Sequence, residues 1–505
     1  MPDFYTKFNG KIDRRSPFNE GDYTNPILRE NWNCRDGKLR KPPGHQAKVT
    51  DLTDIPRWMG RYSSSSSLLV IQPKTFVYTE DGKLSVVDDQ LGTSTIVKEL
   101  LNTGAYPKHQ LFKTANNTKM YLVDGANMYA YDGNEDNLWQ LISIVDADDD
   151  SINPIDIIEH KDRLIIISET DLYISENLNP EVFNSAIDSL HIIVGSGRGK
   201  NLALGKLEDR LYILNTEGIF VLEGDVISAL ASTFDIRLVE NRNIIAGRTA
   251  ITVEKAIVFI ADDYELWSFD GNGSSMLTYD FNLKDLMFRD PDMLRKAVAV
   301  YHDNYYKMSF VENAETEPNL EIWWDALEEK INVVRGRHVS CYMKIDPTVE
   351  VEFIQMGQSN ANKIVQEGIT NDFDGTAIST RLRTRDITPK KGFNIRFLAF
   401  YPEFEPSGNR DIIFRYILDG RLSNPTGANA EWSQNLRGEV KTLGMISITN
   451  QNQFTGRVRP KINYARGESI AFEVIDSTSG LDCNFLGIGI DYVAKHKSKG
   501  ATIGA

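Results

Sequence analysis

Side chains that could perform chemistry are scattered along this chain of 505 residues rather than gathered in a pattern. The seven histidines include no His-Glu-x-x-His or His-x-His spacing, which common zinc sites would show. No Gly-x-Ser-x-Gly sequence places a serine on a nucleophile turn. Paired carboxylates are abundant, but chance pairs many of the 71 acidic residues. We therefore expect a protein that is not an enzyme and that holds no metal or other cofactor.

Two short stretches look like binding loops, but turns explain them better. Residues 146–150 read Asp-Ala-Asp-Asp-Asp, yet Ser151 and Ile157 stand where an EF-hand needs glycine and glutamate. Residues 195–199 read Gly-Ser-Gly-Arg-Gly, yet a strand pattern follows them instead of a helix with a phosphate-binding lysine. We interpret the first as a solvated acidic loop and the second as a loop between repeats.

A basic cluster near the N-terminus is the candidate for contact with a partner protein. Residues 1–50 carry ten Lys/Arg against six Asp/Glu, so the remainder of the chain has a net charge of about −19. Pro17, Pro26, Pro42 and Pro43 punctuate this segment, which predicts an extended arm that ends in a short hairpin at residues 31–44. A solvated edge explains its basic side chains better than a phosphate site does. The candidate contact residues are Arg35, Lys38, Arg40 and Lys41.

The elements that must position these residues repeat along the chain. Between about residues 68 and 368, paired apolar segments return every 44 to 52 residues, close to the period of four-stranded propeller blades. The first segments of the pairs start near Leu68, Met120, Leu164, Leu211, Ile257, Tyr306 and Phe353. This spacing predicts a β-propeller of about seven blades, with six to eight possible.

Local chemistry supports the repeat. Residues 119–133 and 256–271 each contain two short runs of aliphatic and aromatic residues, and each stretch closes on Asp-Gly. Asp-Gly supplies the positive φ that tight hairpin turns require. Strands this short cannot bury both faces alone, so each blade needs neighbours stacked against it. A β-sandwich with accidental spacing is the alternative.

The pattern predicts four regions: an N-terminal arm (residues 1–50), the propeller (51–372), a β-sandwich (373–494) and a flexible tail (495–505). The five serines at 63–67 are predicted to form the loop that enters the first blade. A short helix within residues 285–300 is predicted as an insertion between blades. Trp323 and Trp324 are expected to pack inside a blade. Strands of the sandwich are predicted near residues 378–382, 395–401, 412–418, 444–448, 469–475 and 485–493.

Composition and charge limit the function further. A hydrophobic fraction of 41% and a charged fraction of 25% are typical of a soluble globular protein. No apolar run reaches the roughly 20 residues that span a bilayer, so we expect no stable membrane insertion and no secretory signal. The three cysteines, Cys34, Cys341 and Cys483, argue against a disulfide framework. A net charge of −15 disfavours gripping duplex DNA, but it permits surrounding DNA without holding it.

Three stretches together resemble the tail nozzle and hub proteins of tailed bacteriophages, especially short-tailed ones. Residues 32–44, Trp-Asn-Cys-Arg-Asp-Gly-Lys-Leu-Arg-Lys-Pro-Pro-Gly, resemble the opening motif of those proteins, although Pro42 stands where they usually have arginine. Residues 356–368, with 371–378 and 381–384, are similar to their last blade and its exit strand. Residues 465–475 and 484–492 resemble their closing strand pair.

The resemblance implies a structural protein of the virion tail, assembled in the host bacterial cytoplasm. It implies a ring, a homohexamer, that lies below the portal and head–tail adaptor proteins. DNA would pass through the lumen without sequence recognition, and tail fibres or tailspikes would dock outside. The basic residues of the arm would then clamp an acidic adaptor. The resemblance does not choose between nozzle, hub and stopper.

Two other functions remain open on the sequence. A monomeric propeller can recognise a glycan or a peptide at its central funnel, and a propeller glycosidase of unusual sequence is the weaker alternative. The Ser-x-Asp-x-Gly-x-x-Trp box that sialidase propellers repeat is missing here.

Overall fold

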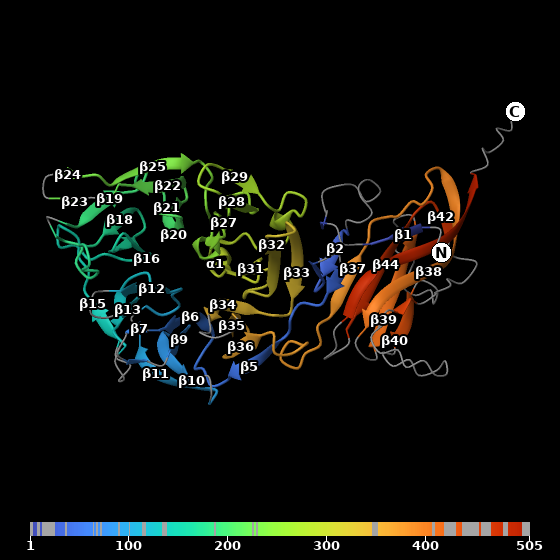
Figure 1. Cartoon of the computed structure of the whole chain (residues 1–505), viewed down its shortest axis with the longest axis horizontal. Helices are drawn as coiled ribbons and strands as arrows, with labels where there is room; N and C mark the ends of the chain where they lie inside the picture. The colour runs from blue at the N-terminus through green and yellow to red at the C-terminus, as the bar shows by residue number, and fades with distance from the viewer. Residues whose placement is uncertain are drawn as a thin grey trace.

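The computed structural model places two bodies side by side, a ring of small sheets and a two-sheet sandwich (Figure 1). The structure describes residues 4–7, 11–12, 26–35, 38–63, 65–66, 69–70, 73–88, 91–99, 102–113, 118–133, 139–185, 188–224, 227–228, 231–345, 352–406, 410–418, 431–436, 454–455, 466–477 and 483–496. In these residues nearly every element is a strand; the exceptions are the helix α1 (Pro291–Arg295) and the 3-10 turns η1 (Gly247–Thr249) and η2 (Leu283–Asp285). None of these helices is long and apolar enough to cross a membrane.

Seven blades of four antiparallel strands form the propeller, as the sequence predicts; six of them are separate sheets, and blade 6 is one part of a nine-stranded sheet. Blade 1 contains β6 (Pro56–Tyr62), β9 (Lys74–Thr79), β10 (Lys83–Asp88) and β11 (Thr93–Glu99); blade 2 contains β12 (Lys108–Lys113), β13 (Thr118–Val123), β14 (Met128–Tyr131) and β15 (Gln140–Ile142); blade 3 contains β16 (Asp156–His160), β17 (Arg163–Ile167), β18 (Asp171–Ile174) and β19 (Leu190–Ile193). Blade 4 contains β20 (Asn201–Leu207), β21 (Arg210–Asn215), β22 (Gly218–Glu223) and β25 (Asp235–Glu240); blade 5 contains β26 (Ile251–Val253), β27 (Ala256–Ile260), β28 (Leu266–Phe269) and β29 (Ser274–Met276). Blade 6 contains β30 (Val298–His302), β31 (Tyr305–Phe310), β32 (Leu320–Asp325) and β33 (Lys330–Arg335).

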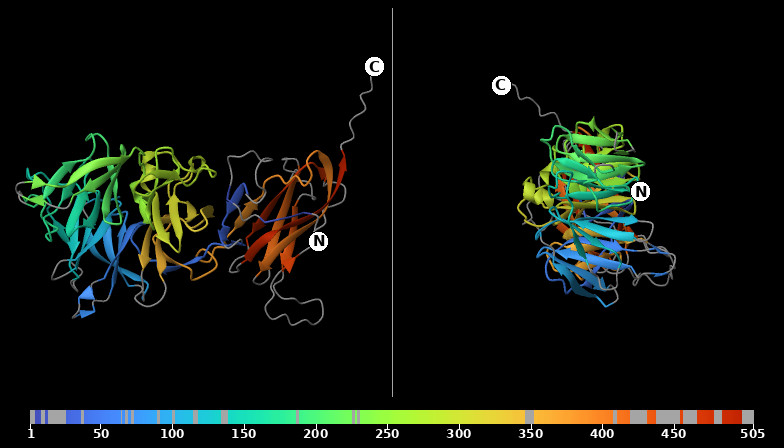
Figure 2. Two further views of the ribbon diagram at one scale, coloured as in Figure 1. Left: turned by 45° about the horizontal axis from the view of Figure 1, so that its top comes forward. Right: turned by 90° about the vertical axis from the view of Figure 1, so that its left-hand side faces the viewer.

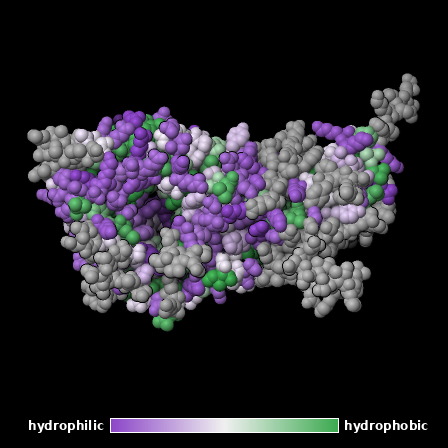
Figure 3. Space-filling model, in the orientation of Figure 1, coloured by the Kyte–Doolittle hydropathy of each residue, from purple (hydrophilic) through white to green (hydrophobic). Residues whose placement is uncertain are grey.

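Blade 7 takes its fourth strand from the other end of the chain. It contains β34 (Val339–Ile345), β35 (Phe353–Gln358), β36 (Ile364–Glu367) and the early strand β5 (His45–Val49), which pairs antiparallel with β36. A strand from the N-terminal region therefore closes the ring. Figure 1 views the propeller along the axis of its ring. The space-filling view in the same orientation shows a hollow near the centre of the propeller, with a mostly hydrophilic rim (Figure 3).

Hydrophobic cores lie between neighbouring blades rather than within them. Trp58 and Phe76 of blade 1 pack with Met120 and Tyr131 of blade 2. Separate clusters join blades 2 and 3, 3 and 4, 4 and 5, 5 and 6, 6 and 7, and 7 and 1. In β17 all five residues are buried, because each face of the sheet meets a neighbouring blade. This arrangement explains why the repeat period is visible as short, fully apolar runs.

The sandwich packs two sheets around one core. One sheet contains β3 (Asn33–Arg35), β4 (Lys38–Arg40), β44 (Cys483–His496) and β38 (Phe393–Pro406), joined by β1 (Phe4–Thr6), β41 (Phe454–Thr455) and β42 (Arg466–Gly467). The other contains β37 (Thr380–Arg383), β43 (Ile470–Asp476), β39 (Arg410–Leu418) and β40 (Glu431–Leu436). Trp32 and Phe485 lie in the core between them.

The N-terminal region is not the extended arm that the sequence predicts. Its hairpin forms as expected from β3 and β4, but β4 pairs with β44 inside the sandwich sheet. The strand β2 (Leu28–Glu30) lies between β33 of blade 6 and β37 of the sandwich, so that one nine-stranded sheet runs through both bodies. Figure 1 and the left-hand view of Figure 2 show this early segment between the propeller and the sandwich. The pattern of prolines and charges predicted an arm because each strand here is only three to five residues long, too short to give a clear strand pattern in the sequence.

Smaller features also differ from the expectations. The first repeat begins with β9 at Lys74, not at Leu68, and the serine run follows β6 instead of preceding the first blade. Part of that run belongs to the small pair β7 (Ser65–Ser66) and β8 (Leu69–Val70); a similar pair, β23 (Ile227–Ser228) and β24 (Ala231–Ser232), lies in blade 4. The strand β44 extends to His496, inside the expected tail, whereas the expected strand at 444–448 lies outside the described residues. The helix α1 forms between blades 5 and 6, where Asp290 caps its first turn.

Candidate functional site at the propeller axis

One face of the propeller gathers the turns and the inter-blade segments. In each blade the turn between the second and third strands makes a backbone hydrogen bond to the segment that leads into or out of that blade. These bonds join Gly104 to Glu80, Gly125 to Pro154, Asn201 to Glu169, Ile244 to Asn215, Asp262 to Asn243, Asn313 to Leu286 and Ser359 to His338. Because the innermost strand of every blade starts at this face, the face surrounds one mouth of the ring's axis.

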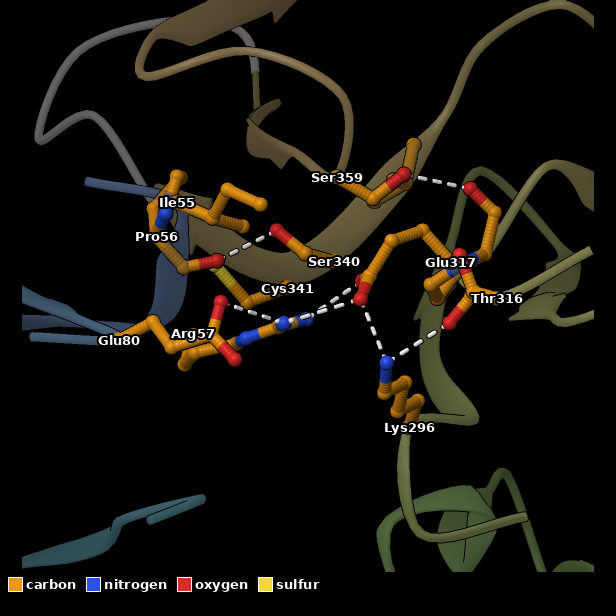
Figure 4. Close-up of polar contacts among 12 residues, drawn as sticks. Ile55, Pro56, Arg57, Glu80, Lys296, Thr316, Glu317, Ser340, Cys341 and Ser359 are labelled. Atoms are coloured by element: carbon orange, nitrogen blue, oxygen red, sulfur yellow. Dashed lines mark hydrogen bonds and ion pairs between the residues drawn. The ribbon is translucent and has the colours of Figure 1, made fainter. Parts of the chain in front are cut away.

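Arg57, the second residue of the innermost strand of blade 1, is the centre of a charge cluster at this mouth. Its guanidinium donates to Glu80 at 2.8 Å and to Glu317 of blade 6 at 2.9 Å (Figure 4). Lys296 donates to the same Glu317 and to the carbonyl of Thr316. Burial alone would lower the pKa of Arg57, but the hydrogen bonds and charges of Glu317 and Glu80 raise it above its ordinary value. Arg57 and Lys296 in turn lower the pKa of Glu317 against the effect of burial.

Arg248, in the 3-10 turn before blade 5, completes this axial cluster. Its guanidinium donates to the carbonyls of Arg57 at 3.1 Å, Ser340 at 3.0 Å and Lys296 at 3.5 Å. The ring of Tyr106 lies beneath it, 4.5 Å from the guanidinium carbon to the ring centre. Among the described residues no carboxylate pairs with Arg248. Burial lowers its pKa to about 10.

The axial cluster joins side chains of several blades through buried and paired polar groups. Its thiol, Cys341, is buried, and burial raises its pKa to about 11, so the nucleophilic thiolate is scarce at neutral pH. The carboxylates of Glu80 and Glu317 already bind Arg57. Ser340 donates to the carbonyl of Pro56, which ties the last blade to the first (Figure 4). No group of metal-ligating side chains occurs in the part of the chain that the structure describes.

A second charge cluster lies buried between blades 6 and 7. Glu367 accepts from both Lys307 and Arg337, and Arg337 also faces Glu321. Burial alone would raise the pKa of Glu367, but the two cations lower it to about 2. For Glu321 burial prevails and its pKa is raised. The pKa values of these two neighbouring carboxylates therefore shift in opposite directions, because Glu367 contacts two cations closely and Glu321 does not.

The structure separates the four basic residues that the sequence singles out. Lys41 is not on a solvated edge, because its ammonium is buried and pairs with the buried Asp476 at 3.2 Å. Arg35 is partly exposed and reaches Asp303 of blade 6 at 3.2 Å. Lys38 is partly buried and Arg40 is exposed, on neighbouring positions of β4. The prediction of a partner contact is therefore wrong for Lys41, and it stays a prediction for the other three.

The two loops that look like binding motifs lie on the propeller. Asp146 accepts from the backbone N–H groups of Asp148 and Asp150, so the acidic stretch shapes its own turn. Residues 195–199 connect β19 of blade 3 to β20 of blade 4, as predicted, and Ser196 donates to Glu217.

Sequence reasoning missed Arg57 and Arg248. Arg57 follows Pro56, whose ring fixes φ, and Arg248 follows Gly247, which has no side chain, just where a blade begins. At Gly247 a Cβ atom would lie 2.1 Å from the carbonyl oxygen of Leu202, so only glycine allows this close approach. A Gly-Arg pair directly before a repeat was the available signal.

Comparison with known proteins extends only to the fold. No protein-family model and no curated protein matches the chain. Among solved structures, BBS1N in complex with ARL6DN matches at 11% identity and a TM-score of 0.40, over 67% of this chain and 97% of that chain. YCF48 bound to D1 peptide matches at 11% identity and a TM-score of 0.38, over 65% of this chain and 97% of that chain. The AfRom2 CNH domain matches at 8% identity and a TM-score of 0.36, over 63% and 97%. The sheet topology of the described residues makes this an all-β protein with a seven-bladed propeller and a β-sandwich.

Proposed function

We propose that this chain is a structural subunit of a bacteriophage tail, a nozzle or hub protein that forms a ring for DNA ejection. The sequence resemblance at residues 32–44, 356–368, 465–475 and 484–492 motivates this assignment. In this proposal six copies enclose the lumen, portal and adaptor proteins lie above, and tail fibres or tailspikes attach outside.

The observation that carries the proposal is the continuous sheet between the two bodies. The strand β2 contributes hydrogen bonds to β33 on one side and to β37 on the other. Around it Asn31 bonds to Arg335 and Ser379, and Glu30 pairs with Arg335 at 2.8 Å. A ring closes only if each copy holds its interfaces at a constant angle. A propeller and a sandwich joined through one sheet meet that requirement better than two domains on a flexible linker.

Charge supports the same assignment. Residues 51–372 carry 28 Lys/Arg against 52 Asp/Glu. Duplex DNA carries a charge about every 1.7 Å, so a basic wall would hold it at each step. An acidic wall repels the duplex within a Debye length of roughly 8 Å and so lets DNA slide past.

The rival function, ligand recognition at the funnel by a monomer, has less support. The polar groups at the mouth of the axis are engaged with one another, since Arg57 already binds two carboxylates and Lys296 shares one of them. A recognition site keeps polar groups available for its ligand.

Light scattering and electron microscopy of the purified full-length chain test the proposal. We expect closed rings with a central lumen wide enough for duplex DNA, formed reversibly as protein concentration rises. A chain that remains monomeric at every concentration contradicts the ring.

A further inference from the structure

The position of Arg248 within the ring is unusual. It rises from the turn η1, which precedes blade 5. Its guanidinium binds the carbonyls of Arg57 in blade 1 and Ser340 in blade 7, and that of Lys296, which precedes blade 6. It also covers the ring of Tyr106, which precedes blade 2. One side chain therefore touches the inner ends of four other blades.

Only a path across the axis makes these contacts possible. In a closed ring of seven, blades 1 and 2 stand opposite blade 5. The innermost strands β6 and β34 face the axis, and Arg248 reaches the starts of both. Gly247 lies close to the backbone of Leu202, so the turn η1 packs against β20 of blade 4. The backbone of Arg248, the next residue, therefore lies near the axis.

The contacts of Arg248 are those of a side chain that fills an opening, not those of one member of an ion pair. Arg57, beside it, pairs with two carboxylates, whereas the hydrogen bonds of Arg248 all go to backbone carbonyls of the surrounding segments. A guanidinium carries five donors in a flat fork, so it can bind several carbonyls around a narrow opening at once. An aliphatic side chain has no donor for these inward carbonyls, and a hydroxyl has only one.

We propose that Arg248 is an axial plug that closes the propeller at the face where its turns gather. No solute then passes along the propeller axis from this mouth. If the ring of the proposed function exists, each subunit is sealed and its DNA lumen lies between copies, not through a propeller. The plug itself does not depend on the ring.

Cys341 reports on the plug. It is 2% exposed, and it follows Ser340, whose carbonyl Arg248 binds. The experiment measures the reaction of methyl methanethiosulfonate with each cysteine of the full-length chain, by mass spectrometry, in the native protein and in Arg248→Gln. The charge of Arg248 lowers the pKa of Cys341, so its removal alone leaves less thiolate and slows the reaction. An open plug exposes the thiol and speeds the reaction, by on the order of tenfold or more.

Two controls separate opening from unfolding. Cys34, buried in the core of the sandwich, should stay unreactive in Arg248→Gln, because general unfolding would expose both thiols. Arg242→Gln removes a neighbouring guanidinium that lies over Trp267 and near Asp263, away from these carbonyls, and should leave Cys341 protected. Faster labelling of Cys341 alone, in Arg248→Gln alone, supports the plug. Unchanged or slower labelling of Cys341, or equal labelling of Cys34, overturns it, whatever the oligomeric state of the chain.

Discussion

At the residue scale, two buried carboxylates in one network are expected to respond oppositely to the same substitution. Glu367 contacts both Lys307 and Arg337, and its pKa is lowered to about 2, whereas the pKa of Glu321 is raised by burial. Removing Glu367 leaves Lys307 without this carboxylate and Arg337 with only the more distant Glu321, and breaking a buried pair in this way typically costs about 3–5 kcal/mol. Removing a charge that burial already disfavours costs little.

We predict that Glu367→Gln lowers the free energy of unfolding by about 3 kcal/mol or more at pH 7, while Glu321→Gln changes it by less than about 1 kcal/mol. The stabilisation from Glu367 is complete above its ordinary pKa of 4.5 and is lost as pH falls toward about 2. The difference between Glu367→Gln and the native chain should therefore shrink in acid. Urea unfolding at pH 7 and pH 3 measures both effects; equal losses in the two variants would contradict the assignment.

Histidine 109 links pH to the core between blades 1 and 2. Trp58 donates to Nδ1 of His109 at 3.2 Å, and burial lowers the pKa of that histidine to about 4. On acidification His109 is protonated near pH 6.5 in the unfolded chain, but only near pH 4 in the folded chain. The stability that depends on neutral His109 is thus present above pH 6.5 and is lost on acidification.

His109→Gln keeps an acceptor for Trp58 and removes this titration. We predict that the free energy of unfolding of this variant falls less steeply between pH 6.5 and pH 4 than that of the native chain. The same substitution at His160 of blade 3, whose pKa is also lowered to about 4, is the matched comparison for the pH profile. Parallel pH profiles for native chain and variant would show that His109 does not titrate in this window.

At the element scale, the joint at β2 decides whether the two bodies behave as one. Asn31 adopts a left-handed backbone with a φ of 53°, and its side chain bonds to Arg335 and Ser379, residues of the two bodies. Alanine removes these bonds and retains a strained backbone, whereas glycine relaxes the backbone.

We predict that Asn31→Ala destabilises the joint by about 2–3 kcal/mol and splits thermal unfolding into two transitions, followed by calorimetry. Asn31→Gly should lie between the native chain and Asn31→Ala, because it restores only the backbone term. Arg35→Ala, which removes the partly exposed pair with Asp303, should cost less than about 1 kcal/mol. A single unshifted transition in Asn31→Ala would mean that the bodies are coupled elsewhere.

At the scale of the whole molecule, the acidic propeller should keep duplex DNA unbound. We predict no change in fluorescence anisotropy of a labelled duplex at 0.15 M salt with the native chain. A variant with lysine at the exposed positions Asp148, Asp149, Glu208 and Asp209 should bind, and added salt should remove that binding. Binding by the native chain itself would contradict a low-friction wall.

The sequence by itself determined the repeat and a propeller followed by a sandwich, and it predicted about seven blades with six to eight possible. Short apolar runs closed by Asp-Gly report directly on local strand and turn chemistry, and inter-blade burial makes them apolar on both faces. Five of the predicted repeat starts lie within two residues of the first residue of a blade's second strand: Met120, Leu164, Leu211, Ile257 and Phe353.

Only the tertiary structure decided where the N-terminal strands and the axial charges go. The strands β2, β4 and β5 pair with partners some 300 or more residues away, and nothing in three to five residues specifies a distant partner. The sequence favours a solvated edge for Lys41, because burial depends on what surrounds a side chain and not on its neighbours in the chain. Nothing next to Arg248 in the sequence indicates the distant carbonyls that it binds. Local chemistry is written in consecutive residues, whereas closure of a ring and the filling of its axis arise only when distant segments meet.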